Sequence, residues 1–179
     1  MKRLIMCEGP NELEIIRILL AYDKLIFGED ELIGLTPYHA RQITGNAQVR
    51  TELNIYPGND VLIMRVGDVQ NERLKIPADY KEKIVDVEKY CTKPELEMLL
   101  IIAEGLVSEY EKVKSDEKPK DFAKRMIRFQ KKKYDNSTAF YREYFGDRPD
   151  VLVEAIREYK RIKGAHRKDE LYLADLIKG

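Results

Sequence analysis

The sequence has few cysteines and no long hydrophobic run. Cys7 and Cys91 are the only two cysteines among 179 residues. They lie far apart and show no CxxC spacing, which argues against a zinc site and against the disulfide framework of a secreted domain. Only four apolar residues separate Arg3 from Glu8, too few for a signal peptide or a membrane span. We therefore expect a cytoplasmic protein without membrane contact.

The sequence also lacks a charge excess and several catalytic motifs. Lys and Arg together number 32, as do Asp and Glu, so the formal net charge is zero and gives no argument for a nucleic-acid partner. Walker, GxGxxG, GxSxG and HExxH motifs are absent, which argues against nucleotide-hydrolysing switches, classical dinucleotide enzymes, serine hydrolases and zincins. Hydrophobic residues at 44% and charged residues at 36% indicate a globular domain with a real core.

Two short apolar runs predict buried strands. Residues 4–7 (Leu-Ile-Met-Cys) end at Glu8, and residues 61–66 (Val-Leu-Ile-Met-Arg-Val) end at Gly67 and Asp68. Runs of this kind are typical of parallel strands that are covered on both faces. Both strands therefore carry an acidic residue directly after their carboxyl ends.

Helix signals fill most of the remaining chain. Asn11 and Glu14 fit a capping box for a helix that ends near residue 22, and residues 92–95 fit another for an apolar helix that ends near residue 103. Weaker signals predict a short strand with a loop in 24–35, a helix start at 36–37, a helix over 47–55, and an edge strand or short helix at 84–90. Periodicity predicts helices over 121–134, 138–145, 151–162 and 170–178.

This order of elements predicts an α/β fold. Strands that alternate with helices, followed by helices alone, indicate three layers around a small parallel sheet, with C-terminal helices added. Residues 1–105 would form the α/β domain, and residues 106–179 a helical extension packed on it.

The two acidic residues at the strand ends predict a site. Ligands of open α/β sheets bind at the carboxyl edge, where strand ends and helix starts converge. Carboxylates brought together there repel one another, and they gain most from a hard divalent cation such as magnesium. Glu8 and Asp68 are therefore candidates for such a site.

The same residues resemble a known family. Residues 7–12 (Cys-Glu-Gly-Pro-Asn-Glu) resemble the first motif of the Toprim domain, and residues 63–68 (Ile-Met-Arg-Val-Gly-Asp) resemble its second strand, which ends in aspartate. Toprim domains occur in topoisomerases, bacterial primases, OLD nucleases and small RNA-maturation nucleases, and the layout here looks closest to the OLD-like or small stand-alone proteins. The resemblance covers roughly residues 1–105.

The resemblance implies a function and a set of residues. It implies a Rossmann-like Toprim fold and a nuclease or phosphotransferase that uses Mg (or Mn) on nucleic acid phosphodiesters. Glu8 would be the catalytic acid or base, and Asp68 would act with the metal. A further glutamate often opens the following helix, which makes Glu95 or Glu97 candidates. The implied metal ligands are Glu8, Glu12, Asp68 and Glu97.

One position departs from the family pattern. The family has Asp-x-Asp, whereas Gln70 stands at the second aspartate position here, and Glu72 or Glu97 would have to substitute. The alternative function is therefore a non-catalytic binding protein on the same fold with a degenerate metal site. Its helical half would then form a homodimer or dock a separately encoded partner protein.

Each acidic residue also has a purely structural interpretation. Glu8 would end a strand, Glu12 would favour the helix dipole, Asp68 would stand in a turn, Glu95 would close a capping box, and Glu97 would pair with a buried arginine. His39 and His166 lack partners at ligand spacing, so structural or surface roles are expected for both.

A basic segment is the candidate nucleic-acid contact. Ten basic residues lie between Lys112 and Lys133, a clear local excess of positive charge. The candidate contacts are Lys124, Arg125, Arg128, Lys131 and Lys132. Phe122, Phe129 and Tyr134 would stack bases, or, by their helical spacing, Phe122, Met126 and Phe129 would face the core instead.

Overall fold

A five-stranded parallel sheet forms the base of the computed structural model, which describes residues 1–68, 72–93, 95–163 and 171–179. The strand order is β2-β1-β3-β4-β7, with every neighbouring pair parallel. The strands are β1 (Lys2–Cys7), β2 (Tyr38–His39), β3 (Val61–Gly67), β4 (Ile84–Cys91) and β7 (Leu171–Tyr172). Cys7 lies beside Val66, and Gly67 beside Cys91, so the strands end at one common edge.

The two central strands are buried on both faces, as the sequence predicts. Leu4 and Met6 of β1 face a core cluster with α2 (Ala47–Ile55), whereas Ile5 and Cys7 face a larger cluster formed with the other helices. This alternation follows from the period of two in a strand. The α/β class and the three-layer arrangement are thereby confirmed.

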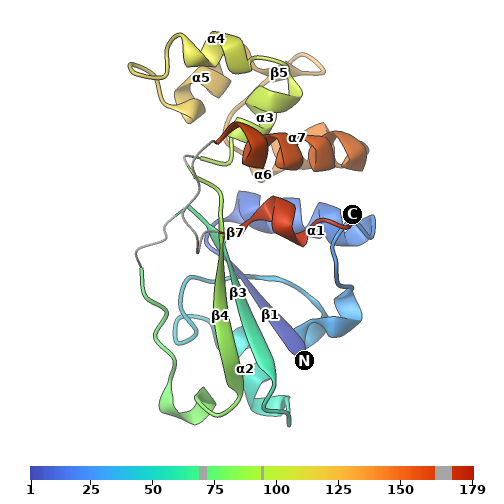
Figure 1. The fold of residues 1–179 in the computed structure, drawn as a ribbon, viewed down its shortest axis with the longest axis vertical. Coiled ribbons are helices and arrows are strands. Elements are labelled where there is room, and N and C mark those ends of the chain that lie inside the picture. Colours follow the sequence, from blue (N-terminus) through green and yellow to red (C-terminus); the bar gives the residue numbers. More distant parts are fainter. Residues whose placement is uncertain (69–71, 94, 164–170) are drawn as a thin grey trace.

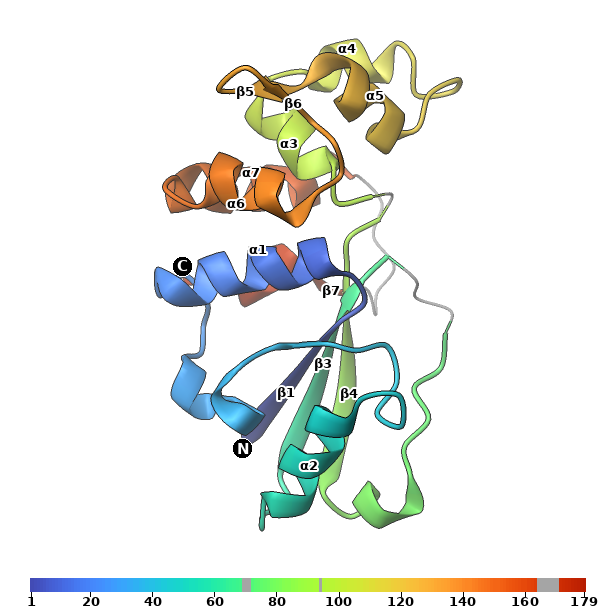
Figure 2. The ribbon, with the colours of Figure 1, turned by 180° about the vertical axis from the view of Figure 1, so that it is seen from behind.

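The helices on the other face are stacked in successive rows away from the sheet. Figures 1 and 2 show α1 (Pro10–Ala21) nearest the strands, then α6 (Thr138–Phe145) and α7 (Pro149–Ile162), and finally α3 (Met98–Ala103). At the far end lie α4 (Val107–Glu111), α5 (Pro119–Met126) and a hairpin of β5 (Arg128–Phe129) and β6 (Lys132–Lys133). Short 3-10 turns cover Glu29–Glu31, Ile33–Leu35, Ala78–Tyr80 and Leu173–Leu176.

The helices over 47–55 and 138–145 form as predicted, and the predicted helix over 151–162 begins slightly earlier, at Pro149. Residues 84–90, for which the sequence left two alternatives, form a strand, β4, between β3 and β7. No helix in the described part of the chain has the length and apolar character needed to cross a bilayer.

Several predicted elements are wrong. Residues 36–37 do not start a helix, because Tyr38 extends beside Met6 in β2. The described segment 24–35 holds 3-10 turns in place of the predicted strand. The helix predicted over 121–134 ends at Met126, where the chain turns into the β5-β6 hairpin. The end of the chain, predicted as a helix, forms β7 and a 3-10 turn; residue 170 lies outside the described residues.

The C-terminal segment shares one core with the sheet. The larger cluster joins strand residues such as Val66 to Tyr141 of α6 and Ile156 of α7. Glu14 of α1 is buried, and its carboxylate accepts two hydrogen bonds from the Arg142 guanidinium of α6, at 3.0 and 3.1 Å. The division into residues 1–105 and 106–179 therefore stays a prediction about the organisation of the chain. The core packing is continuous across it.

We predict that Arg142→Ala lowers the free energy of unfolding by about 2 kcal/mol, because it leaves the buried Glu14 carboxylate without its ion-pair partner. Urea unfolding followed by circular dichroism measures the loss. Arg161→Ala is the matched control, since Arg161 pairs with Glu158 at an exposed surface, and it should leave stability unchanged. Equal losses in the two variants would contradict this account.

Candidate functional site

The ends of β1 and β3 bring Glu8 and Asp68 to one place. The Glu8 backbone N–H donates to Val66 O at 2.9 Å. A Cβ atom added at Gly67 would overlap the Glu8 carboxylate, so this carboxylate lies directly over the residue that precedes Asp68. Glu8 is only 6% exposed. Two acidic residues separated by 60 positions in the chain are therefore neighbours at the carboxyl edge of the sheet.

Helix α1 begins two residues earlier than the capping box predicts. Gly9 is the N-cap and Pro10 the first helical residue, which places Glu12 in the first turn. The Glu12 carboxylate folds back against Gly9, where a Cβ atom would overlap it. Asn11 is not the cap; its side chain donates to Asn136 O at 3.3 Å and accepts from Thr138 Oγ1 at 3.0 Å.

A cleft of about 190 Å³ opens at this edge of the sheet. Four carboxylates line it, those of Glu12, Asp68, Glu95 and Glu97. The other lining residues come from α1 and from the later part of the chain: Asn11, Leu96, Lys120, Asn136 and Tyr141. Three of the four predicted metal ligands thus share one cleft, and the fourth, Glu8, is buried close by.

The electrostatics of Glu12 show that these carboxylates sense one another. Burial is the main cause that raises the pKa of Glu12 above its ordinary value. A hydrogen bond with its own backbone partly opposes this, and the negative charges of Asp68, Glu8 and Glu97 raise the pKa further. Burial, with Glu12 as the next cause, also raises the pKa of the Cys7 thiol. The charged form of Glu12 is therefore disfavoured first by its burial and then by the three negative charges around it.

Glu97 has a buried partner, although not the arginine that the sequence suggests. Its side chain is 4% exposed, and the Tyr134 hydroxyl donates to Glu97 Oε1 at 2.7 Å. The Tyr141 hydroxyl lies 3.3 Å from the Tyr134 hydroxyl. Burial and then the Glu97 charge raise the pKa of Tyr134, which keeps the phenol protonated as a donor. Glu97 is the N-cap residue of α3, where it faces the cleft.

Glu95 stabilises a different helix from the one predicted. Its carboxylate accepts the backbone N–H of Lys120 at 2.8 Å, in the first turn of α5. The predicted capping box is not formed, because Thr92 Oγ1 is buried without a hydrogen-bond partner in the described part of the chain. Pro94, the proline of that box, lies outside the described residues. Glu95 thus ties the cleft to the C-terminal half.

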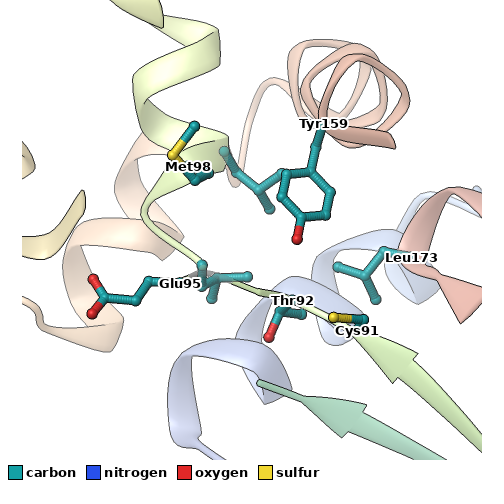
Figure 3. Close-up of a pocket in the computed structure, with 8 residues that line it drawn as sticks. Cys91, Thr92, Glu95, Met98, Tyr159 and Leu173 are labelled. Atoms are coloured by element: carbon teal, nitrogen blue, oxygen red, sulfur yellow. The ribbon is translucent and has the colours of Figure 1, made fainter. Parts of the chain in front are cut away.

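A second pocket lies behind the site and is too small for a substrate. Figure 3 shows Cys91, Thr92, Met98, Tyr159 and Leu173 around it, while the Glu95 carboxylate points away from it. Its volume is about 10 Å³, which is room for one water molecule. The carboxylate cleft is therefore the better candidate for chemistry.

The residues present fit magnesium by their chemistry and leave ligand positions open. Carboxylate oxygens are the ligands that Mg²⁺ prefers, and proteins often supply only one or two of them, with water and substrate phosphates completing the shell. Across residues 1–68, 72–93, 95–163 and 171–179, no three His, Cys, Asp or Glu side chains are grouped closely enough to hold one ion. A cation in this cleft would keep several ligands from outside the protein.

The position of the predicted second aspartate is not described. Gln70 lies outside the described residues, so its relation to the cleft stays open. Glu72, the predicted substitute, accepts a hydrogen bond from Gln42 at 3.1 Å and does not line the cleft. His39 is exposed at the end of β2, consistent with a surface role, and His166 lies outside the described residues.

The predicted nucleic-acid contacts lie on α5 and the β5-β6 hairpin, and all five are exposed. Arg125 donates two hydrogen bonds to Glu117, at 3.0 and 2.7 Å, and Lys132 pairs with Glu143 at 3.0 Å. Phe122 and Tyr134 are buried, so these rings belong to the core, and Phe129 is partly buried against it. Aromatic stacking on bases is therefore not available to the buried pair.

Comparison with protein-family models, with curated proteins and with solved structures gives no match to this chain. The assignment of the site therefore depends on its own geometry. Sequence reasoning missed Lys120, Tyr134, Asn136 and Tyr141, which reach the cleft or its carboxylates from the C-terminal half. No local motif marks them, because their role depends on how that half folds back.

We predict that Glu12→Gln stabilises the metal-free protein at neutral pH. Because folding raises the pKa of Glu12, the native protein loses stability as the pH rises above the ordinary value of 4.5. The glutamine variant lacks this loss. Its advantage should be absent near pH 4 and present at pH 7 to 8, as measured by urea unfolding in a chelating buffer. An advantage of equal size at both pH values would refute the raised pKa of Glu12, which burial causes first and the neighbouring carboxylates increase.

We also predict that Tyr134→Phe lowers the free energy of unfolding by about 1.5 to 3 kcal/mol, because a buried carboxylate loses its hydrogen-bond donor. Tyr141→Phe is the matched control, since its hydroxyl contacts the Tyr134 hydroxyl and bonds to no carboxylate among the described residues. It should cost about 1 kcal/mol. Thermal and urea unfolding measure both; a larger loss in the control would show that the Glu97 bond is not the dominant one.

Proposed function

We propose that this chain is a Toprim-like, Mg-dependent (or Mn-dependent) nuclease or phosphotransferase that acts on nucleic acid phosphodiesters. The observation that carries the proposal is the shared position of Glu8, Glu12, Asp68 and Glu97. They come from three separate segments, and their side chains gather at the carboxyl edge of a parallel sheet. This edge is where ligands of α/β folds bind.

The proposed roles follow from position and from the Toprim resemblance. Asp68, Glu12 and Glu97 line the cleft, and one or two of these carboxylates would hold the cation, with water and phosphate oxygens supplying the remaining ligands. The cation would stabilise the charge that develops on the phosphoryl group. Glu8, buried over Gly67, is assigned the proton transfer. Tyr134 keeps the Glu97 carboxylate in place.

Two observations favour a second function. The described residues contain no group of three possible metal ligands, and the sequence has Gln70 at the second aspartate position of the resemblance. Both fit a non-catalytic protein with a degenerate metal site, in which the cleft binds a partner or a phosphate group without cleaving it. Metal binding separates the two functions.

We predict that the native chain cleaves nucleic acid only with Mg²⁺ or Mn²⁺. Glu8→Gln and Asp68→Asn should each lower the rate by about 10²-fold or more, because each removes a charge that acts directly in the chemistry. Cleavage of labelled single-stranded and double-stranded DNA and RNA measures this. Asp116→Asn is the control. It changes an exposed carboxylate that follows α4 in the sequence, and it should retain full activity.

Calorimetric titration with magnesium accompanies the rate measurements. Millimolar binding that weakens in Asp68→Asn supports the enzyme. A folded native chain that binds no cation and cleaves none of the four substrates would remove the catalytic proposal and leave the binding protein. Equal rates in the native chain, Glu8→Gln and Asp68→Asn would exclude these residues from the mechanism.

A further inference from the structure

Three basic residues form a row that starts inside the acidic cleft. Lys120 lines the cleft, in the first turn of α5. Lys124 follows four residues later, which places it on the same side of the helix, about 6 Å further along the axis. Arg128 follows after the helix, in β5. Both Lys124 and Arg128 are exposed.

The opposite side of α5 fixes the direction of this row. Phe122 and Ala123 are buried in the core, and so is Ile127 directly after the helix. The Lys120 backbone N–H is held by the Glu95 carboxylate at 2.8 Å. The helix therefore cannot roll to turn Lys120 and Lys124 toward the core.

The members of the row differ electrostatically from two of their basic neighbours, Arg125 and Lys132. Arg125 pairs with Glu117, and Lys132 pairs with Glu143, so these two charges are largely neutralised within the chain. Lys120, Lys124 and Arg128 take part in none of the ion pairs among the described residues. This is notable for Lys120, because four carboxylates line the same cleft.

The β5-β6 hairpin connects the row to the site along the chain. Gln130 and Lys131 have φ values of 48° and 68°, so β5 and β6 are joined by a two-residue turn with both residues left-handed. Strand β6 leads directly to Tyr134, whose hydroxyl binds Glu97. The basic row and the carboxylates are thus positioned by one continuous segment.

We propose that Lys120, Lys124 and Arg128 form a track for the phosphodiester backbone of a nucleic-acid strand, which leads that backbone to the carboxylate cleft. The delivery to the cleft rests on the proposed function; binding along the track does not. Basic side chains without base-reading partners contact phosphates and give affinity that is independent of sequence and dependent on salt. The shared ligand chemistry is the phosphodiester backbone of DNA or RNA.

The test measures binding to the full chain in a chelating buffer, so that no cleavage interferes. Fluorescence anisotropy is recorded with labelled single-stranded DNA, duplex DNA and single-stranded RNA of random sequence, and with a polyglutamate peptide, at several salt concentrations. The variant carries Lys120→Gln, Lys124→Gln and Arg128→Gln. The matched control carries Arg125→Gln and Lys132→Gln, which change charges of the same segment that are already paired.

The expected result is an affinity for at least one nucleic acid that falls by tenfold or more in the triple variant. The slope of log affinity against log salt should fall by roughly two to three, since each lost phosphate contact contributes about 0.7 to 0.9. The control variant should lose less than threefold. The strand that binds best identifies the source of the backbone.

Three results would overturn the track: no binding of any nucleic acid by the native chain, equal losses in the triple and control variants, or polyglutamate binding as tight as that of nucleic acid. Circular dichroism confirms that each variant is folded.

If the triple variant loses binding while the native chain cleaves nothing with magnesium, the track stands and the proposed catalysis fails. If cleavage proceeds at an unchanged rate in the triple variant, the catalysis stands and the track fails.

Discussion

Repulsion among carboxylates at the carboxyl edge of the sheet is the constraint on which the site depends. The register of β1 against β3 fixes Glu8 over Gly67, beside Asp68, and the Gly9-Pro10 start of α1 brings Glu12 to the same edge. As long as β1 and β3 keep this register, the carboxylates of Glu8, Glu12 and Asp68 stay at the same edge. Burial first, and then the charges of Asp68, Glu8 and Glu97, raise the pKa of Glu12 in this arrangement. Such strain is typical of positions kept for function rather than for stability.

The C-terminal half provides the contacts that allow the arrangement to persist. Tyr134 donates to Glu97, and Glu95 is satisfied by the backbone of α5. Asn11 is held by Asn136 and Thr138, which connect the start of α1 to the start of α6. The C-terminal segment, which the Toprim resemblance does not cover, is therefore structurally part of the cleft. A fragment ending near residue 105 would leave the carboxylate of Glu97 buried without its donor, or exposed to solvent.

The sequence predicts those elements whose signal is local. Strands β1 and β3 are recognisable because burial on both faces requires an unbroken apolar run, and α2 and α6 because caps and periodicity agree. Strand β2 was missed because two residues acquire their conformation only by pairing with β1. The β5-β6 turn was missed because Gln130 and Lys131 carry none of the Gly or Asn signal that left-handed turns normally show.

The same distinction separates the predictable and unpredictable parts of the site. Strand-end carboxylates can be paired from the sequence, since parallel strands end at one edge. The partner of Glu97 could not be predicted, because Tyr134 lies 37 residues away and the sequence suggests for it only a base-stacking role. Glu95 fits a capping box by spacing, yet its carboxylate binds the amide of Lys120, 25 residues further on. Long-range hydrogen bonds of this kind leave no trace in local spacing.

The net charge of zero conceals two opposed local fields, and their separation decides how a nucleic acid would approach. The basic row begins at Lys120, within the same cleft as Asp68 and Glu97, and extends away from it along α5.

At physiological salt, charges act over about 8 Å, so a phosphate on the outer part of the row would interact mainly with lysine and arginine. A phosphate at the cleft also senses the carboxylates. Under the proposals above, affinity without metal would therefore come from the row, and entry of a phosphate among the carboxylates would require added positive charge, which a divalent cation would supply. Binding and chemistry would then depend on different residues, because the charge that attracts the strand and the charge that admits its phosphate would come from different places.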